Sequence, residues 1–369
     1  MKILLLSCNT GEGHNSAARA LKEQLEEYHI TCDFVDALGL ANKRVSKKIT
    51  DFYVASTAGN PTVFKMMYKA GELYSKIKIK SPVYGMNKLC KKSLTKFISD
   101  GNYDVIVATH LFPAETLTAM KKTNPNLHFL AVATDYVSIP FWEETNPDYF
   151  VIPHSELISE FNKKGISKDK LLPLGIPVSL KFNKRIPKKQ ARLELDLPVN
   201  GNIILIMSGS MGFGNLELTI EKLLNKFDNK ITLVVLCGNN DKIRNSLKDK
   251  FNQPNVYLKS FTTKVSKYMD ASDVILTKPG GLTSTETAVK NIPTILTAPI
   301  PGCETYNARF FENHGLALVD SDIDKIVDKT YLLISDKKLA RQMINNQKKT
   351  INQYAARDIC DFIIKKYNK

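Results

Sequence analysis

Short uninterrupted runs of apolar residues recur along the chain, and each run ends at a polar or glycine-containing turn. The first run, residues 2–8, leads into a glycine turn and then into a segment, 17–28, whose apolar residues recur at helical spacing. Continuous apolar runs of this length predict strands that are buried on both faces, as in a parallel sheet. A strand, a glycine turn and a helix in this order are typical of a doubly wound α/β domain.

The same pattern occurs in both halves of the chain. In the first half the predicted strands are 2–8, 32–35, 103–109, 128–134 and 149–152. In the second half they are 202–207, 231–237, 256–261, 273–277, 292–296 and 316–319. We therefore expect an α/β protein with two doubly wound domains facing a cleft, formed by residues 1–178 and 201–346. A linker, 179–200, joins them, and a C-terminal helix, 347–369, is expected to pack back on the body of the protein.

The composition adds limits on location and metal content. Hydrophobic residues make up 43% of the chain and charged residues 24%, as in ordinary globular proteins. The six cysteines are scattered without metal-ligand spacing, which indicates reduced thiols and no structural zinc. The apolar run at the N-terminus is too short for a signal peptide, and no run of about 18 apolar residues could span a bilayer. We expect a cytoplasmic protein.

The formal net charge of +15 is concentrated in one segment. Residues 41–97 contain 13 Lys or Arg and two acidic residues, a net charge of 13 − 2 = +11, and the lysines alternate with aromatic residues and methionines. This mixture suits a membrane interface that contains anionic lipids. The alternative is that the lysines form the solvated face of ordinary helices. Nucleic acid is disfavoured as a partner because no nucleic-acid-binding module is recognisable.

The segment after the predicted strand 273–277 carries the clearest candidate chemistry. Lys278-Pro279-Gly280-Gly281 is followed at once by a helical segment with Thr283 in its first turn. Amide groups at a helix N-terminus suit a phosphate, and glycine lets the backbone approach it closely. Glu286, one turn into the helix, could accept hydrogen bonds from a vicinal diol. A phosphate beside a diol predicts a nucleotide; the alternative is an ordinary strand-to-helix turn with a solvated Glu286.

The turn after the first strand contains Gly11, Gly13 and His14. A dinucleotide fingerprint would need a third glycine at position 16, where Ser16 stands, so an NAD site is disfavoured. The near-neutral pKa of histidine would let His14 take a proton from an attacking alcohol, although a lone histidine at a turn can equally be structural.

Two other strands of the first half end at polar side chains. His110 follows the strand 103–109, and Asp135 follows the strand 128–134. The carboxyl ends of parallel strands form the edge where ligands bind in open α/β sheets.

Seven motifs stand in a fixed order along the chain. They are Gly11-x-Gly13-His14, Thr134-Asp135-Tyr136 with Trp142, Gly175-Ile176-Pro177-Val178, Gly209-Ser210-Met211-Gly212, Cys237-Gly238-Asn239, Lys278-Pro279-Gly280-Gly281-Leu282-Thr283-x-x-Glu286, and Pro301-Gly302-x-Glu304-x-x-Asn307-Ala308. In this order they resemble the monogalactosyldiacylglycerol synthase and processive diacylglycerol glucosyltransferase group of glycosyltransferase family 28. The similarity covers essentially the whole chain, and it extends more distantly to the enzyme that adds N-acetylglucosamine to lipid I.

The resemblance implies a fold of the GT-B type, with two Rossmann-like domains, and a role for each motif. The donor nucleotide would be bound by Ser210, Gly212, Phe261, Lys278, Gly280, Gly281, Leu282, Thr283 and Glu286. The sugar would contact Glu304 and Asn307. On the acceptor side, His14 would be the base in a loop with Gly11 and Gly13, and Asp135 would be the alternative base or an orienting group.

No metal or other cofactor is expected. Asp320-Ser321-Asp322 and Asp322-Ile323-Asp324 match the DxD pattern of metal-dependent glycosyltransferases. They lie between a predicted strand and a helix beyond the donor motifs, where aspartates commonly cap helices.

The resemblance implies an inverting transfer of glucose or galactose from UDP-glucose or UDP-galactose to diacylglycerol or a glycosyl-diacylglycerol, at the inner face of the cell membrane. The alternatives are a polyprenyl-linked cell-wall precursor as acceptor, a UDP-sugar 2-epimerase, and a non-enzymatic basic binding protein. Two departures leave the sugar undetermined. Ile139 stands where related glucosyltransferases often have histidine, and Cys303 stands where many have glutamine.

Overall fold

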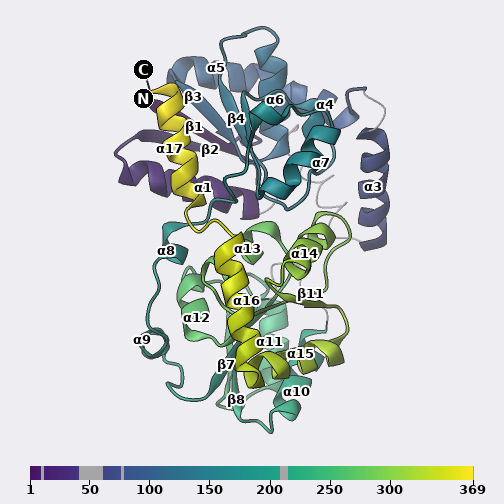
Figure 1. Cartoon of the computed structure of the whole chain (residues 1–369), viewed down its shortest axis with the longest axis vertical. Coiled ribbons are helices and arrows are strands. Elements are labelled where there is room, and N and C mark those ends of the chain that lie inside the picture. Colours follow the sequence, from purple (N-terminus) through teal and green to yellow (C-terminus); the bar gives the residue numbers. More distant parts are fainter. Residues whose placement is uncertain (10–11, 41–60, 76–78, 208–214, 369) are drawn as a thin grey trace. The chain divides into compact units, whose positions relative to one another are not determined.

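The computed structural model describes residues 1–369 except 10–11, 41–60, 76–78, 208–214 and 369 (Figure 1). The chain divides into two compact units, each described here by itself. Unit 1 comprises Met1–Leu180, Pro301–Cys303 and Tyr354–Lys369, and unit 2 comprises Lys181–Ile300 and Glu304–Gln353. Each unit contains one six-stranded sheet in which every pairing is parallel. The predicted two-domain α/β fold is confirmed.

The sheet of unit 1 has the strand order β2-β1-β3-β4-β5-β6. Its strands are β1 (Lys2–Ser7), β2 (Thr31–Asp36), β3 (Val105–Ala108), β4 (Phe129–Val132), β5 (Tyr149–Val151) and β6 (Leu171–Leu172). Ile3 of β1 is in register with Cys32 of β2 on one side and with Val105 of β3 on the other. The strand order therefore reverses between β1 and β3, and such a reversal opens a crevice at the carboxyl ends of the strands.

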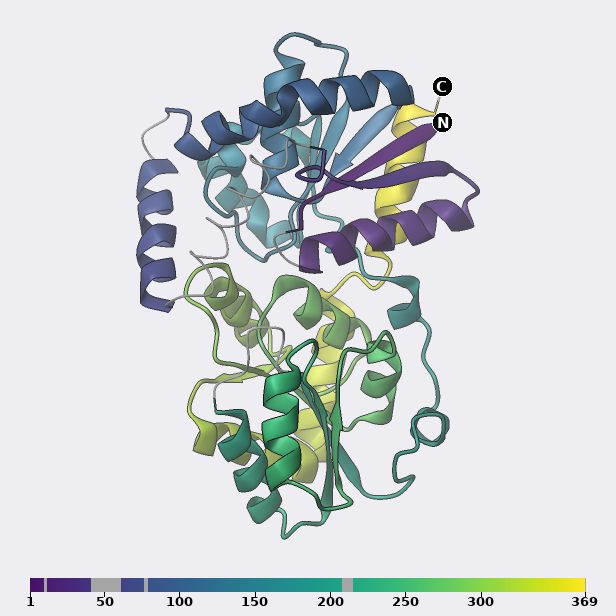
Figure 2. The same cartoon turned by 180° about the vertical axis from the view of Figure 1, so that it is seen from behind.

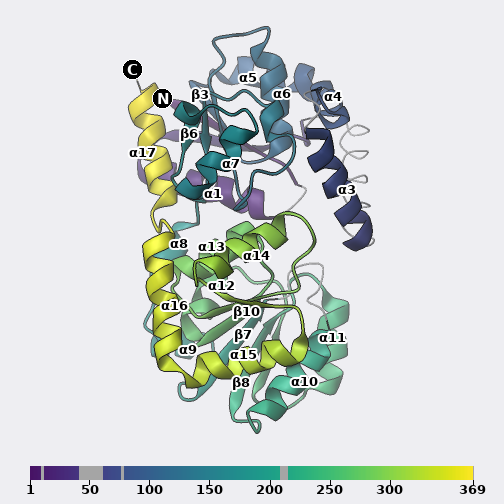
Figure 3. The same ribbon diagram turned by 45° about the vertical axis from the view of Figure 1, so that its right-hand side comes forward.

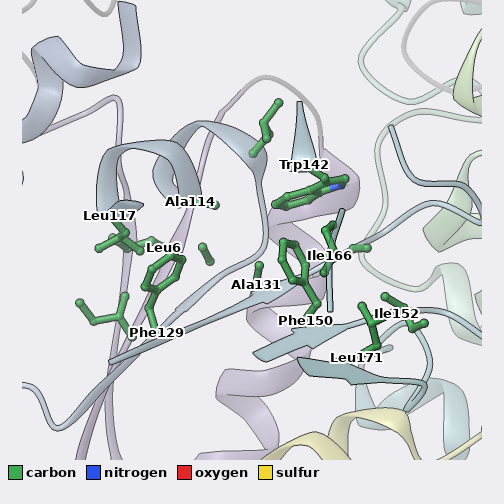
Figure 4. Packing of buried hydrophobic residues seen from close by; sticks show 14 of the residues in the cluster. Leu6, Ala114, Leu117, Phe129, Ala131, Trp142, Phe150, Ile152, Ile166 and Leu171 are labelled. Atoms are coloured by element: carbon green, nitrogen blue, oxygen red, sulfur yellow. The ribbon is translucent and has the colours of Figure 1, made fainter. Parts of the chain in front are cut away.

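Helices cover both faces of this sheet. The helices of unit 1 are α1 (Glu12–Glu27), α3 (Pro61–Tyr74), α4 (Pro82–Asn87), α5 (Lys91–Gly101), α6 (Leu111–Lys121), α7 (Ile158–Lys163) and α17 (Ala355–Tyr367), with short 3-10 turns at Lys88–Cys90, Trp142–Glu144, Ser155–Leu157 and Lys168–Lys170. Because successive strand residues point to opposite faces, Leu4 and Leu6 pack in the cluster with α6 (Figure 4), whereas Ile3 and Leu5 pack in the cluster with α1 and α17.

The sheet of unit 2 has the order β12-β11-β10-β7-β8-β9, which is the 3-2-1-4-5-6 order of dinucleotide-binding folds. Its strands are β7 (Asn202–Met207), β8 (Ile231–Leu236), β9 (Val256–Lys259), β10 (Val274–Thr277), β11 (Thr294–Thr297) and β12 (Leu318–Asp320). Here the order reverses between β7 and β10. The motif that begins at Lys278 directly follows β10, at this reversal.

The helices that accompany the second sheet are α8 (Leu180–Asn183), α9 (Lys188–Leu193), α10 (Leu216–Lys226), α11 (Asp241–Lys250), α12 (Val265–Ala271), α13 (Gly281–Val289), α14 (Cys303–Asn313), α15 (Ile323–Ser335) and α16 (Lys337–Thr350). α16 contacts both α13 and α15 (Figure 3). One core cluster joins the strands to α10, α15 and α16, with Ile204, Ile220 and Met343 among its buried members.

The structure differs from the sequence-based expectation in three elements. β6 is an additional strand of two residues, and α1 begins at Glu12 instead of Ala17. The segment 347–369, expected as one helix, contains the end of α16 and all of α17. The chain is extended at Ile351, whose side chain is buried, and this interrupts the helix.

The apolar stripe of α17 packs back on unit 1, as expected for the C-terminal helix. Ile359, Cys360 and Ile363 are fully buried in the cluster that includes Leu21 and Leu25 of α1 (Figure 2). At the rim, the hydroxyl of Tyr28 donates a hydrogen bond to Asp361 at 2.8 Å.

Candidate functional sites

His14 lies in the first turn of α1, at the carboxyl end of β1. Its Nδ1 atom is 3.1 Å from the carbonyl oxygen of Thr109, the residue after β3, and 2.8 Å from the hydroxyl oxygen of Thr134, which follows β4. The Thr109 hydroxyl in turn donates to the carbonyl oxygen of His14 at 3.0 Å. The imidazole is therefore held at the ends of three neighbouring strands, beside the point where the strand order reverses.

These contacts determine which ring nitrogen of His14 can act as a base. Nδ1 has two partners: the Thr109 carbonyl oxygen, which only accepts, and the Thr134 hydroxyl, which can donate or accept. In the tautomer that donates from Nδ1 to Thr109, the lone pair of the ring is on Nε2. Burial lowers the pKa of His14, while the charge of Asp135 and the hydrogen bond to Thr109 oppose this effect. The ring is consequently neutral near pH 7, with Nε2 able to accept a proton.

His110 packs against His14 in an edge-to-face arrangement, with ring centroids 4.5 Å apart and an interplanar angle of 85°. It is the N-cap of α6, and its Nδ1 accepts a hydrogen bond from the backbone N–H of Phe112 at 3.1 Å. Burial, together with the neighbouring His14, holds the pKa of His110 well below its usual range. Both histidines are thus neutral at neutral pH.

The structure brings several of the predicted acceptor-side residues together in unit 1. Gly13 and His14 lie in the first turn of α1, and half-buried Asp135 follows Thr134. Gly11 lies outside the described residues. Thr109 was not among the predicted site residues, and His110 was predicted to lie at the ligand-binding edge but was given no role. Thr109 follows β3 directly, and this position is the signal that could have identified it.

In unit 2, the predicted phosphate turn forms the N-terminus of α13. Gly280 is the N-cap of α13 and has no side chain that could cap the helix. The amides of Gly281, Leu282 and Thr283 form the first turn, where amides lack intrahelical partners. The backbone N–H of Ser284 donates to the Gly280 carbonyl at 2.9 Å. This geometry suits an anion, and half-buried Lys278 lies just before it.

Glu286 lies one turn further along α13 and is half-buried. Burial raises its pKa to about 8, and the positive charge of Lys181 offsets only part of this effect. At the C-cap of α13, the buried Lys290 ammonium contacts the carboxylate of Asp270 and the carbonyl oxygen of Lys184, each at 2.7 Å. The C-terminal half of α13 is therefore held by a buried ion pair, and Glu286 stands in an environment that disfavours an uncompensated charge.

The two predicted sugar ligands lie on α14 and have partners within unit 2. Asn307 is fully buried and donates to the carbonyl oxygen of Pro279 at 3.0 Å, so it holds the turn that precedes α13. Glu304 accepts a hydrogen bond from the backbone N–H of Ile300 at 2.7 Å. Phe261 follows β9 and its side chain is 65% exposed. Ser210 and Gly212 lie outside the described residues.

The DxD pattern caps a helix in the structure. Asp322 is the N-cap of α15 and accepts from the backbone N–H of Lys325 at 3.0 Å, while Asp320 pairs with Lys329 at 2.8 Å. Within the described part of the chain, no three His, Cys, Asp or Glu side chains are grouped as metal ligands would be. No helix among these residues is long and apolar enough to cross a bilayer.

Two family profiles match the chain, one in each half. The profile described as monogalactosyldiacylglycerol (MGDG) synthase matches residues 14–178, and the profile of the glycosyltransferase family 28 C-terminal domain matches residues 203–360. The chain is similar to the processive diacylglycerol beta-glucosyltransferase of Bacillus pumilus, with 27% identity over 98% of this chain and 94% of the relative.

Solved structures show the same fold at lower sequence identity. One is MurG of Acinetobacter baumannii, with a TM-score of 0.61, 14% identity and 99% of both chains covered. Another is the UDP-GlcNAc 2-epimerase of Neisseria meningitidis bound to UDP-GlcNAc, with a TM-score of 0.65, 16% identity, and 99% of this chain and 100% of that chain covered. With both family profiles matched in order, the chain belongs to the monogalactosyldiacylglycerol synthase and diacylglycerol glucosyltransferase group of glycosyltransferase family 28.

Proposed function

We propose that this glycosyltransferase moves glucose or galactose from a UDP-sugar to diacylglycerol or a glycosyl-diacylglycerol with inversion at the anomeric carbon. The observation that carries the proposal is the environment of His14, a buried imidazole whose Nδ1 contacts the Thr109 carbonyl and the Thr134 hydroxyl. In the tautomer that donates to Thr109, Nε2 holds the lone pair. The acceptor hydroxyl gives its proton to Nε2 as its oxygen bonds to the anomeric carbon. The bond from that carbon to UDP breaks at the same time, and UDP leaves with the electron pair.

The donor role falls to unit 2. The first-turn amides of α13 bind the diphosphate, and the helix dipole with Lys278 stabilises the charge that develops on the departing UDP without a metal ion. Glu286 accepts hydrogen bonds from the ribose diol. Glu304 is the sugar contact, whereas Asn307 supports the loop from behind through Pro279. Ser210, Gly212 and Phe261 keep their proposed nucleotide roles.

The described part of the basic segment 41–97 supports binding to an anionic membrane surface, which we place at the inner face of the cell membrane. On α3, the side chains of Met66 and Leu73 are 67% and 65% exposed. Around α5, lysines line a surface hollow of about 560 Å³; they are Lys88, Lys91, Lys92 and Lys96. Exposed apolar side chains and clustered lysines within one segment suit a surface with acyl chains below anionic headgroups.

Incubation of the protein with radiolabelled UDP-glucose, UDP-galactose or UDP-N-acetylglucosamine and diacylglycerol liposomes tests the proposal. We expect lipid-soluble label with one of the hexoses, and its loss in His14→Gln. Absence of lipid-soluble label with every donor would contradict the transfer to diacylglycerol. Label that enters only polyprenyl phosphate lipids, or conversion of the UDP-sugar without an acceptor, would instead identify cell-wall precursor synthesis or epimerisation.

A further inference from the structure

His110 is fixed in the fold more firmly than its neighbour His14. Only 6% of its surface is exposed, its Nδ1 receives the Phe112 N–H, and the ring of Phe112 packs on it edge to face at 4.7 Å. Because Nδ1 accepts, the hydrogen of the ring is on Nε2, and protonation of Nδ1 would break the cap of α6. His110 is therefore a buried, uncharged ring that is fixed in position beside His14.

Among the described residues, by contrast, the hydrogen bonds to the ring of His14 are all made at Nδ1. Thr109 and Thr134 both contact Nδ1, so these bonds alone leave the ring free to tilt about that atom. The ring of His110 lies against the ring of His14 with an angle of 85° between the ring planes. A tilt of the His14 ring would therefore press it against His110. A base held within a narrow range of orientations is needed for efficient proton transfer.

We propose that His110 is a positioning residue for the transfer reaction: its ring, locked onto α6, holds the imidazole of His14 in one orientation and keeps water away from it. The inference rests on the proposed role of His14 as the base. The ionisable group whose charge acts on His14 is Asp135, which favours the imidazolium that forms when the acceptor proton arrives. Burial and, in turn, the charge of His14 lower the pKa of His110. A neutral His110 adds no repulsion to that imidazolium.

Two substitutions separate the cap from the ring. Asparagine caps helices well, so His110→Asn keeps the cap and removes the ring, whereas His110→Phe keeps a ring and removes the cap. His154 provides a matched control, because it caps the turn Ser155–Leu157 of the same unit in the same way, through the Glu156 N–H at 3.4 Å.

We expect His110→Asn to lower kcat about tenfold, with an unchanged KM for the UDP-sugar, and to lower the apparent melting temperature by roughly 2–4 °C because removal of the buried ring leaves a cavity. The acid limb of its pH profile moves up, toward the ordinary histidine pKa of 6.5, because water reaches His14. His110→Phe lowers the melting temperature by roughly 2–4 °C but leaves that limb in place. His154→Asn changes neither kcat nor the limb.

The pKa of His14 can also be measured directly by NMR titration of histidines labelled at Cε1, in protein that need not turn over. An upward shift of the His14 pKa in His110→Asn, absent in His110→Phe, would support the positioning role even if no UDP-sugar proved to be a donor. Failure of every UDP-sugar as a donor would count only against the proposed function. A His14 pKa and a kcat that are the same in wild type and His110→Asn would overturn the inference. The inference would also be overturned if His110→Asn and His110→Phe lost kcat in the same proportion to their loss of melting temperature.

Discussion

The hydroxyl oxygen of Thr134 lies 2.8 Å from Nδ1 of His14, although 120 residues separate them in the chain. Valine has the shape of threonine without the hydroxyl, so Thr134→Val removes this contact and keeps the packing. A neutral hydrogen bond contributes about 1 kcal/mol, so we expect kcat to fall about five- to tenfold as the ring of His14 becomes less well ordered. Initial rates with liposome substrate measure the effect.

Thr330→Val is the matched control for this change. Thr330 is fully buried in α15 of unit 2, and its hydroxyl donates to the carbonyl oxygen of Ile326 at 2.7 Å. Its substitution removes a comparable hydrogen bond far along the chain from His14, and we expect a small loss of stability with no change in kcat. Equal rates for wild type and Thr134→Val would contradict the role of Thr134.

Binding of UDP should depend on pH through Glu286. Burial raises the pKa of this carboxyl to about 8, whereas a carboxylate is the form that accepts hydrogen bonds from both ribose hydroxyls. We therefore expect the affinity for UDP to rise between pH 6 and pH 8 and then level off, with proton release on binding below pH 8. Isothermal titration calorimetry in buffers of different ionisation enthalpy measures both quantities.

Glu286→Gln should bind UDP more weakly at pH 8 and without this pH dependence. The stability of the unliganded protein gives an independent test, because a carboxyl with a raised pKa in the folded state destabilises the fold as pH rises from its ordinary value of 4.5 to about 8. Glu286→Gln should lose that decline, and Glu221→Gln, at an exposed position of α10, should retain it. Equal affinity of the wild type for UDP at pH 6 and pH 9 would contradict the binding of the ribose by the Glu286 carboxylate.

Gly280 allows the nucleotide role of the α13 turn to be separated from its role in folding. A Cβ atom added at Gly280 would meet no other atom within 4 Å, and the same is true of Gly85 in α4. We expect Gly280→Ala to keep the melting temperature of the wild type but to lower the affinity for UDP about tenfold, because the methyl group stands where the diphosphate approaches the amides. Gly85→Ala should leave the affinity for UDP unchanged. Wild-type affinity in Gly280→Ala would exclude close approach of the phosphate there.

Membrane binding should depend on the exposed apolar side chains of α3. The double variant Met66→Ser/Leu73→Ser should bind vesicles containing anionic lipid at least about tenfold more weakly, because burial of each side chain contributes on the order of 1–2 kcal/mol. Leu193→Ser is the control, since Leu193 is 64% exposed on α9 of unit 2. Vesicle sedimentation measures the partition, and binding that is indifferent to anionic lipid content would remove the membrane role of the basic segment.

The parallel sheets could be predicted because every strand that is buried on both faces leaves a continuous apolar run, as in residues 202–207. β6 could not be predicted, since a strand of two residues is too short to show a pattern of apolar and polar positions. The start of α1 was placed too late because Gly13 indicates a turn, whereas here it lies inside the first helical turn.

The candidate sites were predicted as sets of residues but not as arrangements. Strand ends and motif order identified His14, Asp135 and Glu286. However, the partner of His14 is the carbonyl oxygen of Thr109, and that of Asn307 is the carbonyl oxygen of Pro279. Backbone carbonyls are present at every position, so no sequence pattern marks the one that a side chain will reach. The raised pKa of Glu286 depends in the same way on burial that only the folded unit creates.

The position of α17 in unit 1 has a consequence for the synthesis of the protein. Unit 1 begins at the first strand, but one side of its sheet is completed by Ile359, Cys360 and Ile363, which are translated after all of unit 2. At about 5–20 residues per second, the interval between Leu180 and Ala355 lasts roughly 10 to 35 s. During this time the apolar surfaces of α1 and β1 have no partner from α17, so the nascent chain presents a binding surface for chaperones while unit 2 is still being made.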